Sequence, residues 1–172
     1  MPTAAARTLL ICAWLGALAG YSEAGSSGVL VADPKSGCKV WNPHPLDGET
    51  ASWSGGCANG FAQGAGTLQW LRGGKAIETD EGEWNLGLQS GRGTQEWNAG
   101  RYQGELLNGE PNGQGVLILQ SGRYEGEFRS GKPNGEGTVT NFQGIFKGHW
   151  KDGCLKEEKR KISFGVPATT CP

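Results

Sequence analysis

Short segments of the chain alternate apolar and polar residues, and Gly, Asn and Pro separate these segments. Between residues 124 and 129, Tyr124, Gly126 and Phe128 occupy every second position, and the positions between them are charged. This period of two is typical of a β-strand with one buried face. A second short strand, such as residues 138–140, follows after a turn, so each unit is predicted to be a β-hairpin.

The predicted turns contain residues that favour tight changes of chain direction. Segments 108–113 and 130–135 each carry a Gly, then a Pro, then Asn-Gly. Proline fixes φ, and Asn-Gly tolerates the positive φ angles of hairpin turns. We therefore place the turn of each hairpin within these six residues.

The glycines recur at a fixed spacing along the chain. The same spacing occurs in four segments, residues 55–66, 82–93, 104–115 and 126–137. Successive segments start 22 residues apart, except that the first two start 27 apart, which predicts a longer connection around residues 71–80. A partial copy covers residues 146–153. Four complete repeats and a partial fifth thus occupy residues 51–155, as expected of units that stack in series.

The copies that begin at Tyr102 and Tyr124 share a specific pattern, Tyr-x-Gly-Glu-[Leu/Phe]-x-x-Gly-x-Pro-Asn-Gly-x-Gly. This pattern resembles the membrane occupation and recognition nexus (MORN) repeat. A leucine-rich repeat has a similar period, but its leucine ladder is absent here. The second copy has Asp80 at the aromatic position, which suggests a capping or degenerate unit. We predict an all-β fold in which tandem antiparallel β-hairpin repeats form an elongated, curled single-layer sheet.

Two aromatic registers recur with the repeat and point to one face of this sheet. The paired glycines lack a Cβ atom, so a ring from a neighbouring strand can lie flat against the backbone. These aromatic residues, which we call the aromatic stripe, form the core of the sheet. Where the curled sheet leaves them exposed, they form a groove for a strand, a helix or a glycan, and the two roles can coexist. The candidate binding face consists of Trp53, Trp84, Tyr102, Tyr124, Phe128, Phe146 and Trp150.

Composition narrows the class of protein. The chain has 172 residues and a net charge of -1, without the basic excess that drives binding to nucleic acid. Its 31 glycines lack the every-third period of collagen. Hydrophobic residues make up 36% of the chain, which favours a thin sheet over a thick two-layer core.

The N-terminus predicts export. Arg7 precedes an apolar run over residues 8–19, and small residues follow it, as in a secretory signal peptide. A run of this length is too short for a membrane-spanning helix, which needs about 20 apolar residues. We assign residues 1–24 to a signal peptide and residues 25–50 to an N-terminal segment and cap. The mature protein is then periplasmic or extracellular.

Four cysteines remain after this segment, and an even number in an exported chain favours two disulfides. Three connectivities are possible. We favour Cys38 with Cys57 and Cys154 with Cys171, because each pair brackets one end of the repeats, where a terminal unit lacks a neighbour.

The sequence offers no catalytic, metal-binding or cofactor-binding motif. Glu83, Glu105 and Glu127 share one register, but successive copies lie two strands apart on a face that we interpret as solvated. His44 and His149 are isolated. Residues 126–132 match the opening of a phosphate-binding loop, but Pro133 replaces its Ser or Thr. We therefore expect neither an enzyme nor a small-molecule cofactor.

The tail after the repeats, residues 156–172, is predicted to be a charged strand and cap, with a last strand at residues 162–166. Its basic residues, from Lys156 to Lys161, could contact anionic lipid headgroups or form a solvated strand edge.

Our leading hypothesis is a non-catalytic scaffold that binds a protein partner or self-associates. A peripheral module for anionic phospholipid headgroups is the main alternative, since MORN arrays accompany membrane-associated activities, and an envelope enzyme is the third.

Overall fold

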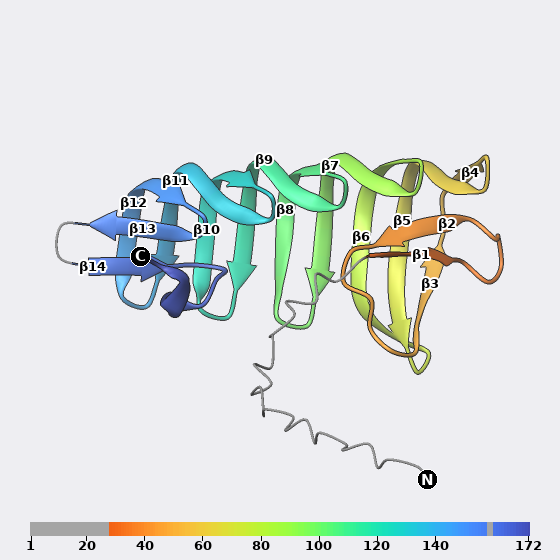
Figure 1. Ribbon diagram of the computed structural model, residues 1–172, viewed down its shortest axis with the longest axis horizontal. Coiled ribbons are helices and arrows are strands. Elements are labelled where there is room, and N and C mark those ends of the chain that lie inside the picture. Colours follow the sequence, from red (N-terminus) through yellow and green to blue (C-terminus); the bar gives the residue numbers. More distant parts are fainter. Residues whose placement is uncertain (1–27, 158–159) are drawn as a thin grey trace, which may run out of the picture.

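The computed structural model describes residues 28–157 and 160–172 of the chain. The described residues form an elongated 14-stranded sheet of successive hairpins (Figure 1). The predicted all-β fold is therefore confirmed. The predicted signal peptide, residues 1–24, lies outside the described residues. In the described part of the chain, no helix has the length and apolar character needed to cross a bilayer.

The centre of the sheet is a run of antiparallel strands in chain order. These strands are β5 (Phe61–Arg72), β6 (Lys75–Asn85), β7 (Leu88–Trp97), β8 (Gly100–Leu107), β9 (Glu110–Leu119), β10 (Gly122–Arg129), β11 (Lys132–Asn141) and β12 (Gly144–Lys151). Shorter elements lie at the two ends: β1 (Val29–Ala32), β2 (Lys39–Asn42), β3 (Glu49–Trp53), β4 (Gly56–Ala58), β13 (Cys154–Glu157), β14 (Arg160–Ser163) and the 3-10 helix η1 (Ala168–Thr170). Strand β2 pairs with β5 in the parallel direction, at Lys39 and Phe61.

The hairpin turns are shorter than the sequence predicted. Between β8 and β9 the turn is Asn108-Gly109, and both residues have positive φ, 55° and 84°. This is the backbone of a two-residue type I′ turn, which matches the twist of paired strands. Pro111 lies inside β9, opposite Leu106 and next to a bulge. The turn therefore lies within residues 108–113, as predicted, but it is only two residues long. Pro111 belongs to the strand, where a bulge accommodates the missing proline N–H.

The turn glycines also link each repeat to the one before it. The N–H of Gly109 donates a 2.8 Å hydrogen bond to the carbonyl of Gln89, 20 residues earlier. Gly131 and Gly153 donate in the same way to Pro111 and Pro133. These bonds fix the spacing of adjacent hairpins along one edge of the sheet.

The extra residues between the first two repeats lengthen a hairpin instead of a loop. Strands β5 and β6 stay paired as far as Arg72 and Lys75, and Gly73-Gly74 makes the turn. The connection around residues 71–80 is longer, as predicted, and its added residues are paired as strand on both sides of the turn.

The repeat glycines form one row across eight strands. The row runs through Gly66, Gly82, Gly93, Gly104, Gly115, Gly126, Gly137 and Gly148. The ring of Tyr102 lies over Gly115, where an added Cβ atom would collide with it. Its hydroxyl donates a 2.8 Å hydrogen bond to the carbonyl of Glu105. Tyr124 lies over Gly137 in the same arrangement, so the glycines are ring-binding positions of a rigid sheet.

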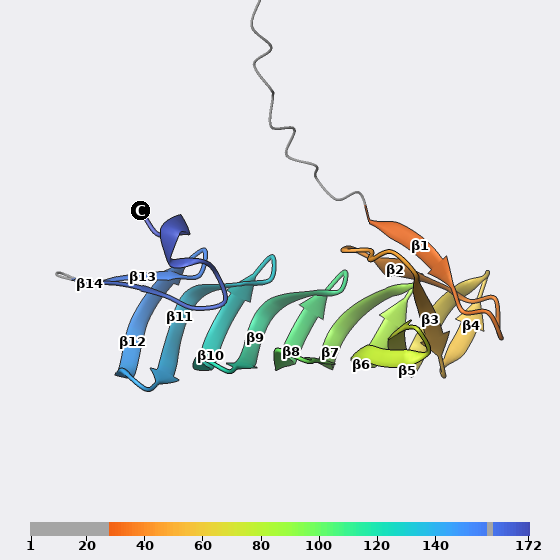
Figure 2. The same ribbon diagram turned by 90° about the horizontal axis from the view of Figure 1, so that it is seen from below.

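Disulfides hold both ends of the array. Cys38 bonds to Cys57 and Cys154 bonds to Cys171, which is the pairing that their positions favoured. The last strand is β14, not residues 162–166, because the chain turns away at Gly165, whose φ is 70°. Both ends fold back on the same side of the hairpins, as Figure 2 shows.

Candidate binding groove

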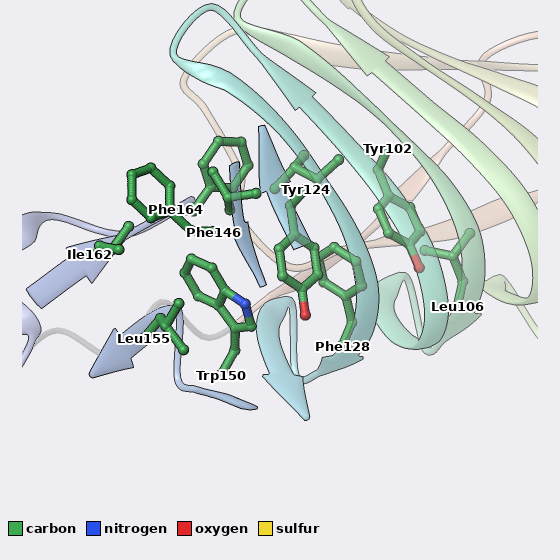
Figure 3. Packing of buried hydrophobic residues seen from close by; sticks show 11 residues of the cluster. Tyr102, Leu106, Tyr124, Phe128, Phe146, Trp150, Leu155, Ile162 and Phe164 are labelled. Carbon is green, nitrogen blue, oxygen red and sulfur yellow. The ribbon is translucent and has the colours of Figure 1, made fainter. Parts of the chain in front are cut away.

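The seven residues of the predicted binding face are all buried, and they divide between two clusters. Trp53 and Trp84 belong to the N-terminal cluster, where their rings meet edge to face at 5.1 Å. The C-terminal cluster, shown in Figure 3, contains the other five, Tyr102, Tyr124, Phe128, Phe146 and Trp150. The aromatic stripe therefore forms the core of the sheet, which is the first of the two roles expected for it.

The two clusters separate where a cross-strand row of core residues becomes polar. This row crosses the sheet through Trp53, Leu68, Asp80, Gln95, Tyr102, Leu117, Tyr124, Val139 and Phe146. Asp80 and Gln95 are paired directly with each other in the second repeat. All other members of the row carry aromatic or aliphatic side chains.

The second repeat differs from the third and fourth at three core registers. Asp80 replaces the tyrosine of Tyr102 and Tyr124. Gln89 stands where these repeats have Pro111 and Pro133, and Gln95 stands where they have Leu117 and Val139. Above Gly93, the Gln89 amide and a Leu106 methyl occupy the place that a tyrosine ring takes in the next repeats. The second repeat thus lacks a ring at the centre of the sheet.

We call Asp80, Gln89 and Gln95 the polar break. A cavity of about 750 Å³ lies over it. Its floor includes Asp80, Trp84, Trp97 and Tyr102 on the face of the sheet. The segment from β2 to the start of β3, which we call the N-terminal loop, contributes one wall, with Trp41, His44, Leu46 and Glu49. The C-terminal tail contributes Gly165 and Val166 at the other end. The two capped ends and the polar break therefore form one groove, and its volume is within the usual range for ligand sites.

Two polar atoms in the cavity wall have no hydrogen-bond partner. Gln95 Nε2 donates to Gln89 Oε1 at 3.1 Å and to the Gly109 carbonyl at 2.9 Å. In contrast, Oδ1 of Asp80 and Nε1 of Trp84 are buried and unpaired. A buried polar group without a partner is costly, by about 1–3 kcal/mol, so native structures seldom contain one without a functional reason.

The carboxyl groups of the cavity have raised pKa values. Burial raises the pKa of Asp80 well above its usual 3.8, and the charge of Glu78 raises it further. Burial also raises the pKa of Glu78 from its usual 4.5, and the charge of Glu49 adds to this effect. Both carboxyls therefore hold their protons more tightly than exposed carboxyls do.

The raised pKa of Asp80 predicts that stability decreases as pH rises. The folded state binds this proton more tightly than the unfolded state, so the stabilisation is complete below pH 3.8 and is lost as pH rises through the raised native pKa. Asp80→Asn removes this dependence. In urea unfolding between pH 3.5 and about 8, we expect the stability of Asp80→Asn relative to wild type to increase with pH. A constant difference across that range would show that Asp80 titrates normally.

The other acidic and basic candidates are not part of the groove. Glu105 and Glu127 lie against Gly113 and Gly135, and Glu127 accepts a backbone hydrogen bond from Glu136. The exposed His149 pairs with Glu136 at 3.2 Å. No group of three or more potential metal ligands occurs among the described residues.

The sequence interpretation did not identify the groove, although the sequence carried its signal. It noted Asp80 only as a departure from the repeat, and it treated His44 as an isolated loop residue. Glu49, Glu78, Gln89 and Gln95 were not identified. An alignment of the repeats with one another would have shown three polar residues at core registers of a single unit.

Comparison with protein families supports the repeat assignment. The model of the MORN repeat matches three consecutive segments, residues 81–100, 102–122 and 124–141. These are the second, third and fourth units that the glycine spacing defines. A comparison with curated proteins gives no match.

Proposed function

The chain is a MORN repeat-containing protein, and we propose that it is an exported, non-catalytic binding module whose groove holds a segment of a protein partner. MORN repeats are generally non-enzymatic modules that bind proteins or membranes. The groove between the capped ends has a volume of about 750 Å³ and is lined by both apolar and polar side chains.

The observation that carries this proposal is the polar break in the core row. A repeat that served only to fill the array would keep its tyrosine and its aliphatic partner, because these residues stabilise the neighbouring repeats. Asp80, Gln89 and Gln95 instead leave an open cavity with an unpaired carboxyl oxygen. Departures from a structural pattern that lower stability are typical of functional sites.

Export is part of the proposal. The predicted signal peptide supports it, and the two disulfides are compatible with an oxidising compartment outside the cytoplasm. The site would then face the periplasm or the exterior of the cell.

Self-association is a second form of the same function. Two large apolar side chains are exposed at one end of the β11–β12 hairpin, Phe142 in the turn at 90% and Ile145 in β12 at 72%. Contact between such turns would join arrays side by side and leave the groove open. Binding of anionic lipid headgroups receives less support, because the carboxyls of Glu49, Glu78 and Asp80 line the groove and would repel phosphate.

Affinity capture with the full chain as bait tests the groove. Leu46 lies in the groove wall and is 49% exposed, whereas Leu107 is 54% exposed and lies outside the groove. We expect Leu46→Lys to reduce capture of a specific partner about tenfold, since contacts at the centre of an interface dominate affinity. The matched Leu107→Lys should capture as wild type does. Equal losses in both variants, or in neither, would exclude the groove as the binding site.

A further inference from the structure

The cavity of the groove is lined by more acidic than basic side chains. Of the described residues in its wall, Glu49, Glu78, Asp80 and Glu110 carry carboxyl groups, and only Lys132 carries a permanent positive charge. The salt bridges identified in the described part of the chain, Arg123–Glu125 and His149–Glu136, involve none of these carboxyls. The protein therefore supplies little internal compensation for the acidic groups.

Asp80 is the member of this group that most needs a partner. It is 4% exposed, and its carboxyl group interacts with Trp70 and Glu78, but its Oδ1 has no hydrogen-bond partner. Glu49 differs, since it accepts hydrogen bonds from Asn42 Nδ2 at 2.7 Å and from the Leu46 N–H. A buried carboxylate is stable only when a cation or several donors compensate its charge. An incoming donor with a positive charge would satisfy Asp80.

Indole rings surround this acidic site. Trp41, Trp70, Trp84 and Trp97 all contribute to the cavity wall. The face of an indole attracts an alkylammonium or guanidinium group, and it also packs against the methylene groups of a long side chain. Carboxyls beside indole faces thus suit a ligand with an apolar stem and a cationic end.

We propose that this cavity receives a lysine or arginine side chain of the partner segment, with its cationic end at Asp80 and Glu78 and its stem between the tryptophans. This assignment rests on the proposed function, because the groove must hold a protein segment for its side chain to enter. A neutral sugar would pack on the indoles equally well, but it would leave the carboxyls uncompensated. An anionic ligand would add to the repulsion.

Binding of a cation in this cavity should depend on pH. Burial raises the pKa values of Asp80 and Glu78, and a bound cation would lower them, so cation binding is coupled to proton release. Affinity for a cationic side chain should therefore rise with pH. A neutral ligand held only by the indoles would bind equally at all pH values in this range.

Capped amino acids test the cavity directly, with the whole chain as receptor. The probes are N-acetyl-lysine and N-acetyl-arginine methylamides, and the neutral matches are the norleucine and citrulline methylamides. Binding is followed by NMR, at the indole N–H signal of Trp84. We expect the cationic probes to bind about tenfold more tightly than their neutral matches, the ratio that a charge-assisted hydrogen bond provides.

The variants separate charge from shape. Asp80→Asn keeps the size of the side chain and should remove the preference for the cationic probes and its pH dependence. Glu125→Gln, at an exposed carboxyl outside the cavity, should leave both unchanged. Equal binding of lysine and norleucine probes, or full preference in Asp80→Asn, would overturn the proposal. Putrescine that binds more than about tenfold tighter than the lysine probe would also overturn it, because a free diamine would then be the better ligand.

The same data distinguish this inference from the proposed function. A partner whose capture depends on Leu46, without any preference for cationic probes, would refute the inference and leave the groove as a protein-binding site. Cationic probes that bind at Asp80, without any partner that depends on Leu46, would refute the proposed function.

Discussion

Replacing Trp150 by Ala is expected to lower the free energy of unfolding by about 3–5 kcal/mol, the range for removal of a large buried aromatic side chain. Trp150 is completely buried, and its Nε1 donates a 3.1 Å hydrogen bond to the carbonyl of Gly137. Its ring meets that of Tyr124 edge to face at 5.4 Å. Figure 3 shows the indole between Tyr124 and Leu155. Loss of this ring would therefore detach the C-terminal cap from the repeats.

Urea unfolding with both disulfides intact measures this effect. Ile145 lies on the same strand, β12, and is 72% exposed, so Ile145→Ala provides the matched control. The control should change stability by no more than about 0.5 kcal/mol, as surface substitutions usually do. A loss below about 1 kcal/mol for Trp150→Ala would mean that the aromatic row does not support the sheet.

The repeat architecture could be predicted because each of its requirements is local in sequence. A ring such as Tyr124 needs a bare backbone beside it, and only glycine at Gly137 provides one, so the spacing of these residues is fixed by contact. The alternation of residues identifies the strands and their buried face. The cysteine pairing could also be predicted from local position, because each pair lies at one end of the array.

Two local features differ from the simple repeat pattern. Proline favours a turn because its φ is fixed, but a bulge opposite Leu106 accommodates Pro111 in β9. The extra residues near Gly73 lengthen the connection between the first two repeats, and the pairing of Arg72 with Lys75 shows that they extend its strands.

The groove could not be predicted from single residues because it is a property of neighbouring units. Asp80 alone signals only a degenerate repeat. It becomes part of a site because the adjacent strand places Gln95 opposite it and the N-terminal loop brings Trp41 and Glu49 over it. That loop precedes the repeats, and no repeat pattern determines where it folds.

The second prediction with a large expected effect concerns substitution of the polar break. The triple substitution Asp80→Tyr, Gln89→Pro and Gln95→Leu gives the second repeat the residues of the third at these three registers. The Gln89 change is needed because its amide occupies the space above Gly93 where the new ring must lie. Proline is compatible with this position, since Pro111 has the same pairing in the next hairpin.

The triple substitution should raise the stability of the protein and abolish binding in the groove. The new ring fills the space above Gly93 and the substitution removes the buried, unpaired carboxyl, so stability should rise by about 1–3 kcal/mol. The groove should lose its partner and its preference for cationic probes, because the carboxyl and the space above it are gone. Glu81→Gln, an exposed change on the same strand that also copies the third repeat, is the control and should alter neither property.

The most direct test of the account is to measure stability and partner binding together in this repaired chain. Urea unfolding and binding of the lysine probe are recorded for wild type, the triple variant and Glu81→Gln. The account predicts a triple variant that is more stable than wild type and does not bind, because the break in the core row lowers stability and creates the site. A triple variant that is less stable, or one that binds as wild type does, would contradict the claim that the break is the binding site.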